Sequence, residues 1–168
     1  MKKLLSLAII VVLFSSIILL SGCVTKPVIV EIEMEDGGII KLELYPDIAP
    51  ITVANFVRLA NEGFYDGLIF HRVMSGFMIQ GGQNADVNTP TITGEFSSNG
   101  IQNDIRHERG VISMARVARQ PVSSFPNDVN SASTQFFIMH GDAPHLNGIH
   151  AAWKNGADIK NHRYCRDS

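Results

Sequence analysis

The stretch that decides the fold of this chain reads FHRVMSGFMIQGG and runs from Phe70 to Gly82. Its pattern predicts two short β segments that are joined by a turn at Ser75-Gly76. Alternation along the first segment places Arg72 on the same face as Phe70. A permanent cation beside large apolar side chains suits a ligand that is uncharged but polar, such as a peptide bond.

Alternating apolar and charged residues predict a β-hairpin upstream of this stretch. Every second residue from Val28 to Met34 is apolar, and the same period returns from Ile40 to Leu44. Asp36-Gly37-Gly38 lies between the two segments and has the composition of a tight turn. The two segments are therefore expected to pair as half-buried antiparallel strands.

The period changes from two to about 3.6 residues between the hairpin and the Phe70 stretch. From Ala49 to Asn61, apolar residues recur at the spacing of one helix face, as in Val53 and Phe56. Pro50 suits the first turn of a helix, and Gly63 suits the position after its last turn. The sequence therefore predicts one amphipathic helix that packs on the sheet.

The rest of the chain predicts short strands separated by long excursions. Residues 81–107 read as a long ordered loop with a short strand near Gly94–Phe96, and residues 116–133 read as a second long loop. Val111–Ala115 and Gln135–His140 are apolar runs of a length typical of buried strands. Strands around one clear helix favour a mainly β fold, a β-barrel closed by helical plugs.

Three blocks of the sequence, in one order, resemble the cyclophilin family over residues 28–153. The first is the Phe70–Gly82 stretch, the second reads GVISMAR from Gly110 to Arg116, and the third reads STQFFI from Ser133 to Ile138. His145-Leu146-Asn147-Gly148 and His150 follow in the same order. The resemblance implies a closed antiparallel β-barrel with capping helices, and an enzyme that isomerises X-Pro peptide bonds.

The resemblance also implies a set of site residues. The family's catalytic arginine falls on Arg72, and its polar substrate contacts fall on Gln80 and Gln135. The backbone at Ala115 and Arg116 is expected to bind the peptide as an added strand. The positions that correspond to the family's proline pocket are Phe77, Met78, Phe137, Leu146 and His150.

Plainer interpretations of these residues stay open at this stage. Arg72 could be a surface charge at a strand end, and the large apolar residues could belong to the core rather than to a pocket. Phe136 and Phe137 are adjacent in a predicted strand and must point to opposite faces, so at most one of them lines a groove. The resemblance favours Phe137. The apolar neighbours of Gln80 and Gln135 predict that each amide has a hydrogen-bond partner.

Composition and spacing exclude several other functions. The formal net charge of −2 offers no basic surface for nucleic acid. His140, His145 and His150 are spaced by five residues, which fits no helical metal motif, so neither a metal nor another cofactor is expected. His145 stands where many eukaryotic cyclophilins carry tryptophan, and we therefore expect weak cyclosporin binding.

The N-terminus predicts export and attachment to a membrane. Lys2-Lys3 precede an uncharged stretch from Leu4 to Leu20, and Leu20-Ser21-Gly22-Cys23 resembles the end of a prokaryotic lipoprotein signal. Residues 1–22 would be removed and Cys23 would carry the lipid, which places the protein on the outer face of the cell membrane. A plain membrane-spanning anchor is the alternative, since about 17 to 25 apolar residues suffice to span a bilayer.

The predicted domain order follows from these boundaries: a signal peptide at 1–22, a tether at 23–27, the isomerase domain at 28–153 and a divergent tail at 154–168. The tail is mostly polar, has Ile159 as its one branched aliphatic residue, and shows neither period. We expect it to be disordered, and the barrel to be incomplete at its C-terminal end as though the reading frame had been truncated. With Cys23 lipidated, Cys165 has no disulfide partner.

The favoured function is a membrane-tethered peptidyl-prolyl isomerase that helps exported proteins to fold. Proline-containing polypeptides are its expected substrates. The first alternative is a module of the same fold that binds proline segments with little turnover, because its barrel is truncated. A lipoprotein that only scaffolds partners is the weaker third alternative.

Overall fold

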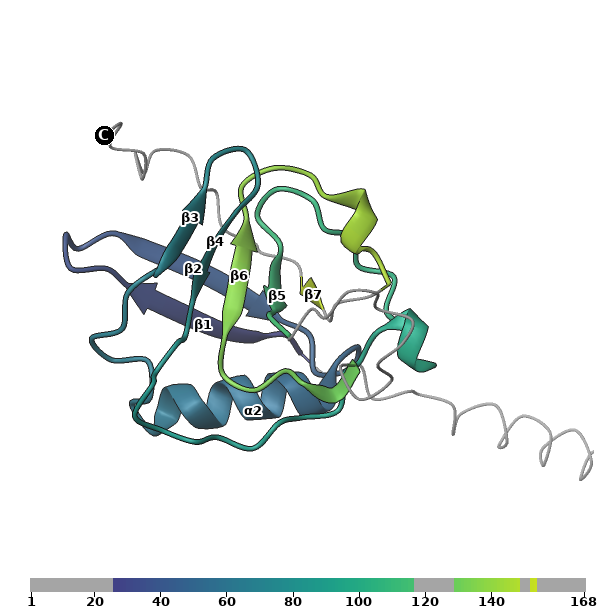
Figure 1. Cartoon of the computed structure of the whole chain (residues 1–168), viewed down its shortest axis with the longest axis horizontal. Helices are drawn as coiled ribbons and strands as arrows, with labels where there is room; N and C mark the ends of the chain where they lie inside the picture. Colours follow the sequence, from purple (N-terminus) through teal and green to yellow (C-terminus); the bar gives the residue numbers. More distant parts are fainter. Residues whose placement is uncertain (1–25, 117–128, 149–151, 154–168) are drawn as a thin grey trace, which may run out of the picture.

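The computed structural model describes residues 26–116, 129–148 and 152–153. These residues form two antiparallel sheets and one α-helix (Figure 1). One sheet has the order β1-β2 and the other has the order β3-β4-β6-β5-β7. Helix α2 lies across one end of the strands. The elements are β1 Val28–Glu33, β2 Ile39–Leu44, α2 Pro50–Asn61, β3 Arg72–Met74, β4 Met78–Gly81, η1 Ser97–Asn99, β5 Ile112–Met114, β6 Phe136–Met139, η4 Pro144–Leu146 and β7 Ala152–Trp153.

The predicted hairpin is confirmed. β1 and β2 pair in register from Val28 opposite Leu44 to Glu33 opposite Ile39. Gly37 takes φ +79° in the turn, a backbone conformation that glycine adopts without steric cost. Alternate residues of β2 are buried, and Leu42 and Leu44 are fully enclosed.

The predicted helix is also confirmed, with Pro50 in its first turn. Val53, Phe56 and Leu59 lie on its buried face, each at most 3% exposed. The ring of Phe56 meets the ring of Phe136 edge-on, with centroids 5.3 Å apart. This contact fixes the helix against β6 in the main core.

The five-stranded sheet separates two apolar clusters. Its residues Ile112, Met114, Phe136 and Ile138 join the main core with β2 and α2. Phe137 belongs instead to a second cluster, hereafter the Phe137 cluster. The prediction that Phe136 and Phe137 point to opposite faces is therefore confirmed. The buried members of the Phe137 cluster are Met78, Val111, Phe137, Met139 and Ala143.

Two sequence predictions about strands are wrong. Arg72 and Phe70 do not share a face, because β3 begins only at Arg72 and the residues before it are not a strand. Phe70 packs edge-on against Phe136 in the main core, whereas Arg72 bonds to Gln80. Gly94–Phe96 is not a strand either, although Ile92 forms an isolated bridge with Ala132.

The mainly β class with a helix packed on the sheets is confirmed. Within the described ranges, no strand pairing joins the β1-β2 sheet to the five-stranded sheet, so closure into a barrel stays a prediction. The predicted signal peptide, Cys23, His150, Cys165 and the tail at 154–168 lie outside the described residues. Among the helices that the structure describes, none is long and apolar enough to cross a membrane.

Candidate active site

Strand register brings three predicted site residues and Ser113 into one row across the five-stranded sheet. Arg72 on β3 lies opposite Gln80 on β4, and Gln80 lies opposite Phe137 on β6. Phe137 in turn lies opposite Ser113 on β5. Directly opposed residues in antiparallel strands place their side chains on the same face. The row therefore gathers residues that are up to 65 positions apart in the chain on the face that carries the Phe137 cluster.

Hydrogen bonds connect Arg72 and Gln80 of this row to Gln135, which directly precedes β6. Arg72 Nη1 donates to Gln80 Oε1 over 3.4 Å, and Gln80 Nε2 donates to Gln135 Oε1 over 2.8 Å. Arg72 Nη2 also contacts the sulfur of Met74 at 3.0 Å. The predicted partners of Gln80 and Gln135 are thus each other. Because Gln80 gives its N–H to Gln135, its oxygen is left to face the guanidinium.

The Phe137 cluster lies beside Arg72 and Gln80. Met78 and Phe137 are buried in it, and Phe77 and Leu146 are half-buried members of the same cluster. Phe77 precedes β4 in the turn, and Leu146 ends the short helix η4. His145, at the position of the family's tryptophan, stacks on Phe77 with centroids 6.1 Å apart. Four of the five predicted pocket residues therefore gather, and the fifth, His150, lies outside the described residues.

Ala115 and Arg116 follow directly after β5 and are both half-buried. The Ala115 N–H donates to the carbonyl oxygen of Gln135 over 2.8 Å, which places this segment beside the Gln135 amide. The guanidinium carbon of Arg116 lies 5.1 Å from the centre of the Phe96 ring. This cation–π contact directs the Arg116 side chain onto a buried aromatic ring.

Sequence reasoning missed a buried polar group behind Phe137. His107 is 1% exposed, and its ring stacks on Phe137 with centroids 6.0 Å apart. His107 Nε2 lies 3.2 Å from Ser113 Oγ, and Nδ1 lies 3.3 Å from Asn147 Oδ1. Burial lowers the pKa of His107 below its ordinary value of 6.5. Only the fold joins these residues, since no motif in the sequence links them.

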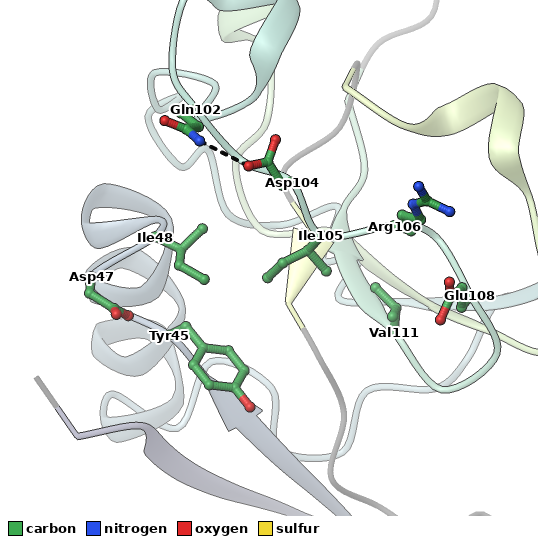
Figure 2. A pocket seen from close by; sticks show the side chains of 9 residues that line it. All are labelled: Tyr45, Asp47, Ile48, Gln102, Asp104, Ile105, Arg106, Glu108 and Val111. Atoms are coloured by element: carbon green, nitrogen blue, oxygen red, sulfur yellow. Dashed lines mark hydrogen bonds between the residues drawn. The ribbon is translucent and has the colours of Figure 1, made fainter. Parts of the chain in front are cut away.

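A cavity of about 860 Å³ is lined in part by Ile105 and Val111, which also belong to the Phe137 cluster (Figure 2). None of the predicted site residues lines it. Its rim includes the carboxylates of Asp47 and Asp104, and Gln102 donates to Asp104 over 2.9 Å. Among the described residues, no three histidine, cysteine, aspartate or glutamate side chains gather as metal ligands would. The remaining lining residues are Tyr45, Ile48, Arg106 and Glu108.

Comparison with known proteins gives this fold and site a family. The family model described as cyclophilin type peptidyl-prolyl cis-trans isomerase/CLD matches residues 29–155. Over 122 residues the chain is 46% identical to peptidyl-prolyl cis-trans isomerase B of Bacillus subtilis, covering 71% of this chain and 77% of that protein. It is 41% identical over 123 residues to a peptidyl-prolyl cis-trans isomerase of Synechococcus elongatus, covering 73% and 77%.

A solved structure supports the same assignment. A cyclophilin type isomerase of Cryptosporidium parvum, crystallised in the presence of the dipeptide Ala-Pro, matches with a TM-score of 0.61 at 27% identity. The match covers 76% of this chain and 77% of that one. Fold and site thus define an enzyme of the prolyl isomerase class. The chain belongs to the cyclophilin-type peptidyl-prolyl cis-trans isomerases. The roles of its individual site residues stay predictions.

Proposed function

We propose that this isomerase accelerates X-Pro isomerisation in exported polypeptides as they fold, with Arg72 as its catalytic residue. Its proline pocket would be formed by Phe77, Met78, Phe137, Leu146 and His150. The observation that carries the proposal is the chain of hydrogen bonds from Arg72 through Gln80 to Gln135, which lies beside the Phe137 cluster. The described residues that form this site are an arginine, two glutamines and apolar side chains, none of which is a nucleophile. Such a site suits a reaction in which no covalent bond is made or broken.

The reaction needs little more than preferential binding of a twisted peptide bond. Rotation about the bond faces a barrier of about 18–20 kcal/mol, because resonance gives C–N partial double-bond character. In an X-Pro bond the two isomers are close in energy, and uncatalysed exchange takes tens to hundreds of seconds. An enzyme accelerates the exchange when it binds the twisted state better than either planar state.

Arg72 can supply that preference through one hydrogen bond. Twisting localises a lone pair on the prolyl nitrogen, and the guanidinium can donate to it. Arginine keeps its proton at all accessible pH values and presents its donors on a rigid plane. Gln80 holds the guanidinium from the opposite strand, so little reorganisation is needed as the bond twists.

The apolar side chains would hold the prolyl ring while the rest of the peptide rotates. Phe137 and Met78 are already buried, so their positions are set before any ligand binds. A ring bound on them displaces water from beside the guanidinium, and electrostatic interactions strengthen when water is excluded. The solved relative's Ala-Pro dipeptide is a ligand of the size that we expect here.

The exported location is proposed from the N-terminal sequence. The basic start, the apolar run from Leu4 to Leu20 and the Leu-Ser-Gly-Cys ending support attachment through lipid at Cys23. Attachment through more than one acyl chain is stable, whereas a single chain holds a protein only marginally. Clients of this enzyme would then be polypeptides that emerge outside the cytoplasm.

Replacing Arg72 tests the assigned catalytic role. Arg72→Ala is expected to lower kcat/KM for a short X-Pro peptide at least a hundredfold, since one preorganised donor contributes about 2.7–4 kcal/mol to the barrier reduction. Arg72→Lys is the matched control: it keeps the charge but loses the planar fork, and we expect it to recover only part of the activity. The measurement is a protease-coupled assay on folded protein, checked by circular dichroism.

Near-normal turnover by Arg72→Ala would refute the role of Arg72. A wild-type protein that binds the peptide without accelerating its isomerisation would instead support the alternative of a proline-binding module.

A further inference from the structure

His107 lies directly behind the predicted proline pocket, although no peptide-contacting role falls on it. It is 1% exposed, and its ring stacks at 20° on Phe137, with centroids 6.0 Å apart. Its carbonyl oxygen accepts from the N–H of Ala143, which precedes helix η4. His107 therefore contacts the pocket wall on β6 and the segment that carries Leu146.

The hydrogen bonds of His107 define its tautomer. The backbone N–H of His107 donates to Asn147 Oδ1 over 2.8 Å, so that atom is the amide oxygen, which can only accept. Ring atom Nδ1 lies 3.3 Å from the same oxygen and must carry the ring proton. Nε2 is then the acceptor for the Ser113 hydroxyl at 3.2 Å. Each ring nitrogen thus has a partner while the imidazole is neutral.

We propose that His107 is a positioning residue, which holds Phe137 and the turn of Leu146 in the geometry that binds proline only while its imidazole is neutral. The proposal rests on the proposed function, because it assumes that Phe137 and Leu146 form the proline pocket. It adds a residue that acts through Phe137 rather than on the peptide. Protonation of His107 would also lower the enzyme's activity at acidic pH, independently of Arg72.

The surroundings of His107 disfavour its protonated form. Phe137 from β6 and Ser113 from β5 carry no charge, and neither does Asn147 at the end of η4. Among the described residues, His145 is the titratable group whose charge acts on His107, and it opposes protonation. Burial is the largest cause that lowers the pKa of His107, and the hydrogen bond to Asn147 partly offsets it.

Protonation would disturb the pocket wall in two ways. A charge would be placed in a desolvated site beside the Phe137 ring, which favours exposure of the imidazole to water. Nε2 would also change from acceptor to donor, so the Ser113 hydroxyl would have to reverse its role. Both changes act on β5, on β6, which carries Phe137, and on the segment that leads into η4, which ends at Leu146.

The pH dependence of kcat/KM for an X-Pro peptide tests the proposal, because this quantity reports the pKa values of the free enzyme. In the wild type we expect activity to fall roughly tenfold per pH unit once the pH is below the pKa of His107. His107→Gln keeps a donor and an acceptor but cannot titrate. It is expected to lose this acid limb, at the cost of a few-fold lower kcat/KM at pH 8 because the ring stack is gone.

Two further variants distinguish His107 from its neighbours. Asn147→Asp keeps the acceptor oxygen and adds a negative charge beside Nδ1, which raises the pKa of His107 and should move the acid limb to higher pH by about one unit or more. His145→Gln removes the neighbouring imidazole and should keep the acid limb. An acid limb that survives in His107→Gln, or that vanishes in His145→Gln, overturns the proposal.

Nuclear magnetic resonance on the ligand-free protein provides a test that needs no enzymatic activity. We expect the Phe137 ring resonances to shift with the same midpoint as the His107 imidazole in the wild type, and to stay constant in His107→Gln. If the wild type has no isomerase activity, the proposed function fails, while this titration still decides the role of His107. Phe137 signals that are unchanged by protonation of His107, or a His107 that stays neutral until the protein unfolds, contradict it.

Discussion

At the scale of single residues, the geometry of Arg72 depends on its neighbours rather than on burial. The side chain is exposed, and an exposed arginine ordinarily samples many rotamers. Here Gln80 and Met74 both contact its terminal nitrogens, and Gln135 fixes the orientation of the Gln80 amide. The row therefore restricts a mobile cation without removing it from solvent. This arrangement leaves the guanidinium accessible to a substrate.

Gln80 is predicted to act through Arg72. A hydrogen bond to a charged group contributes about 1.5–3 kcal/mol, and at 3.4 Å this one belongs at the lower end. Gln80→Ala should therefore lower kcat/KM about tenfold. Because the effect passes through the guanidinium, it should nearly disappear when Arg72→Ala is already present. The measurement is a double-mutant cycle of kcat/KM values.

Gln80→Glu is the matched control for this cycle. It keeps an oxygen acceptor for Arg72 but cannot donate to Gln135, so its activity should lie between the wild type and Gln80→Ala. Fully additive effects of Gln80→Ala and Arg72→Ala would show that Gln80 does not position the guanidinium.

The sequence could indicate Arg72, Gln80 and Phe137 because they fall in short blocks with a recognisable order. It could not indicate His107. That residue meets Asn147 40 positions away, and it meets Phe137 only because β5 and β6 pair beside it. A lone histidine in a polar stretch has no periodicity, so its burial follows from the tertiary fold alone.

At the scale of elements, helix α2 depends on a side chain from a distant loop. Its own N-cap residue, Ala49, offers no side-chain hydrogen bond. Glu95, which is 2% exposed, accepts instead from the backbone N–H groups of Ile51 and Thr52 at 3.0 and 2.8 Å. The Thr52 hydroxyl also donates to it, over 2.6 Å. A carboxylate at this end of a helix also interacts favourably with the helix dipole.

Removing this carboxylate should therefore destabilise the whole domain. We expect Glu95→Ala to lower the free energy of unfolding by about 2–3 kcal/mol, because it leaves buried donors without their acceptor. Glu62→Ala at the other end of the same helix is the control. It breaks an exposed ion pair with Arg58, which contributes less than about 1 kcal/mol. Urea unfolding followed by circular dichroism measures both, and equal losses would contradict the capping role.

The same glutamate explains why one strand was mispredicted. Gly94–Phe96 has a strand-like composition, but Glu95 turns inward to cap α2 and Asn103 bonds to its carbonyl oxygen. Contacts across 43 positions override the local preference. The hairpin and the helix could be predicted because each regular pattern extends over many residues. The strand around Phe70 could not be predicted, since the chain before Ser75 pairs with β4 only from Arg72 onward.

At the scale of the whole molecule, the two faces of the five-stranded sheet have different roles. The main core joins Phe136 to the hairpin and to α2, and it holds the domain together. The Phe137 cluster lies on the opposite face, beside Arg72 and Gln80. A substitution in the main core should therefore affect stability first, whereas one beside Arg72 should affect catalysis first. The tether proposed at Cys23 lies outside both clusters in sequence.

The proposed lipid anchor is tested on the full chain expressed in a bacterium. We expect the mature protein to begin at Cys23, to lack residues 1–22 and to carry lipid on that cysteine. Mass spectrometry of the N-terminal peptide and partitioning of the protein into detergent measure these properties. Cys23→Ala should leave the precursor uncut, so its polypeptide should be longer by those 22 residues. Both proteins should fractionate with membranes, because the uncut apolar segment can itself anchor the chain.

Both a lipoprotein and a spanning anchor would associate with membranes. The length of the polypeptide, with or without residues 1–22, therefore distinguishes the two. If residues 1–22 remain in the wild type, and Cys23→Ala has the same length and no loss of lipid, the anchor is the apolar segment itself. Isomerase activity of the solubilised protein should be equal in the wild type and in Cys23→Ala, because Cys23 lies 49 positions before Arg72 and precedes the first strand. Unequal activity would mean that the anchor influences the site, which the separation of the two in the sequence does not predict.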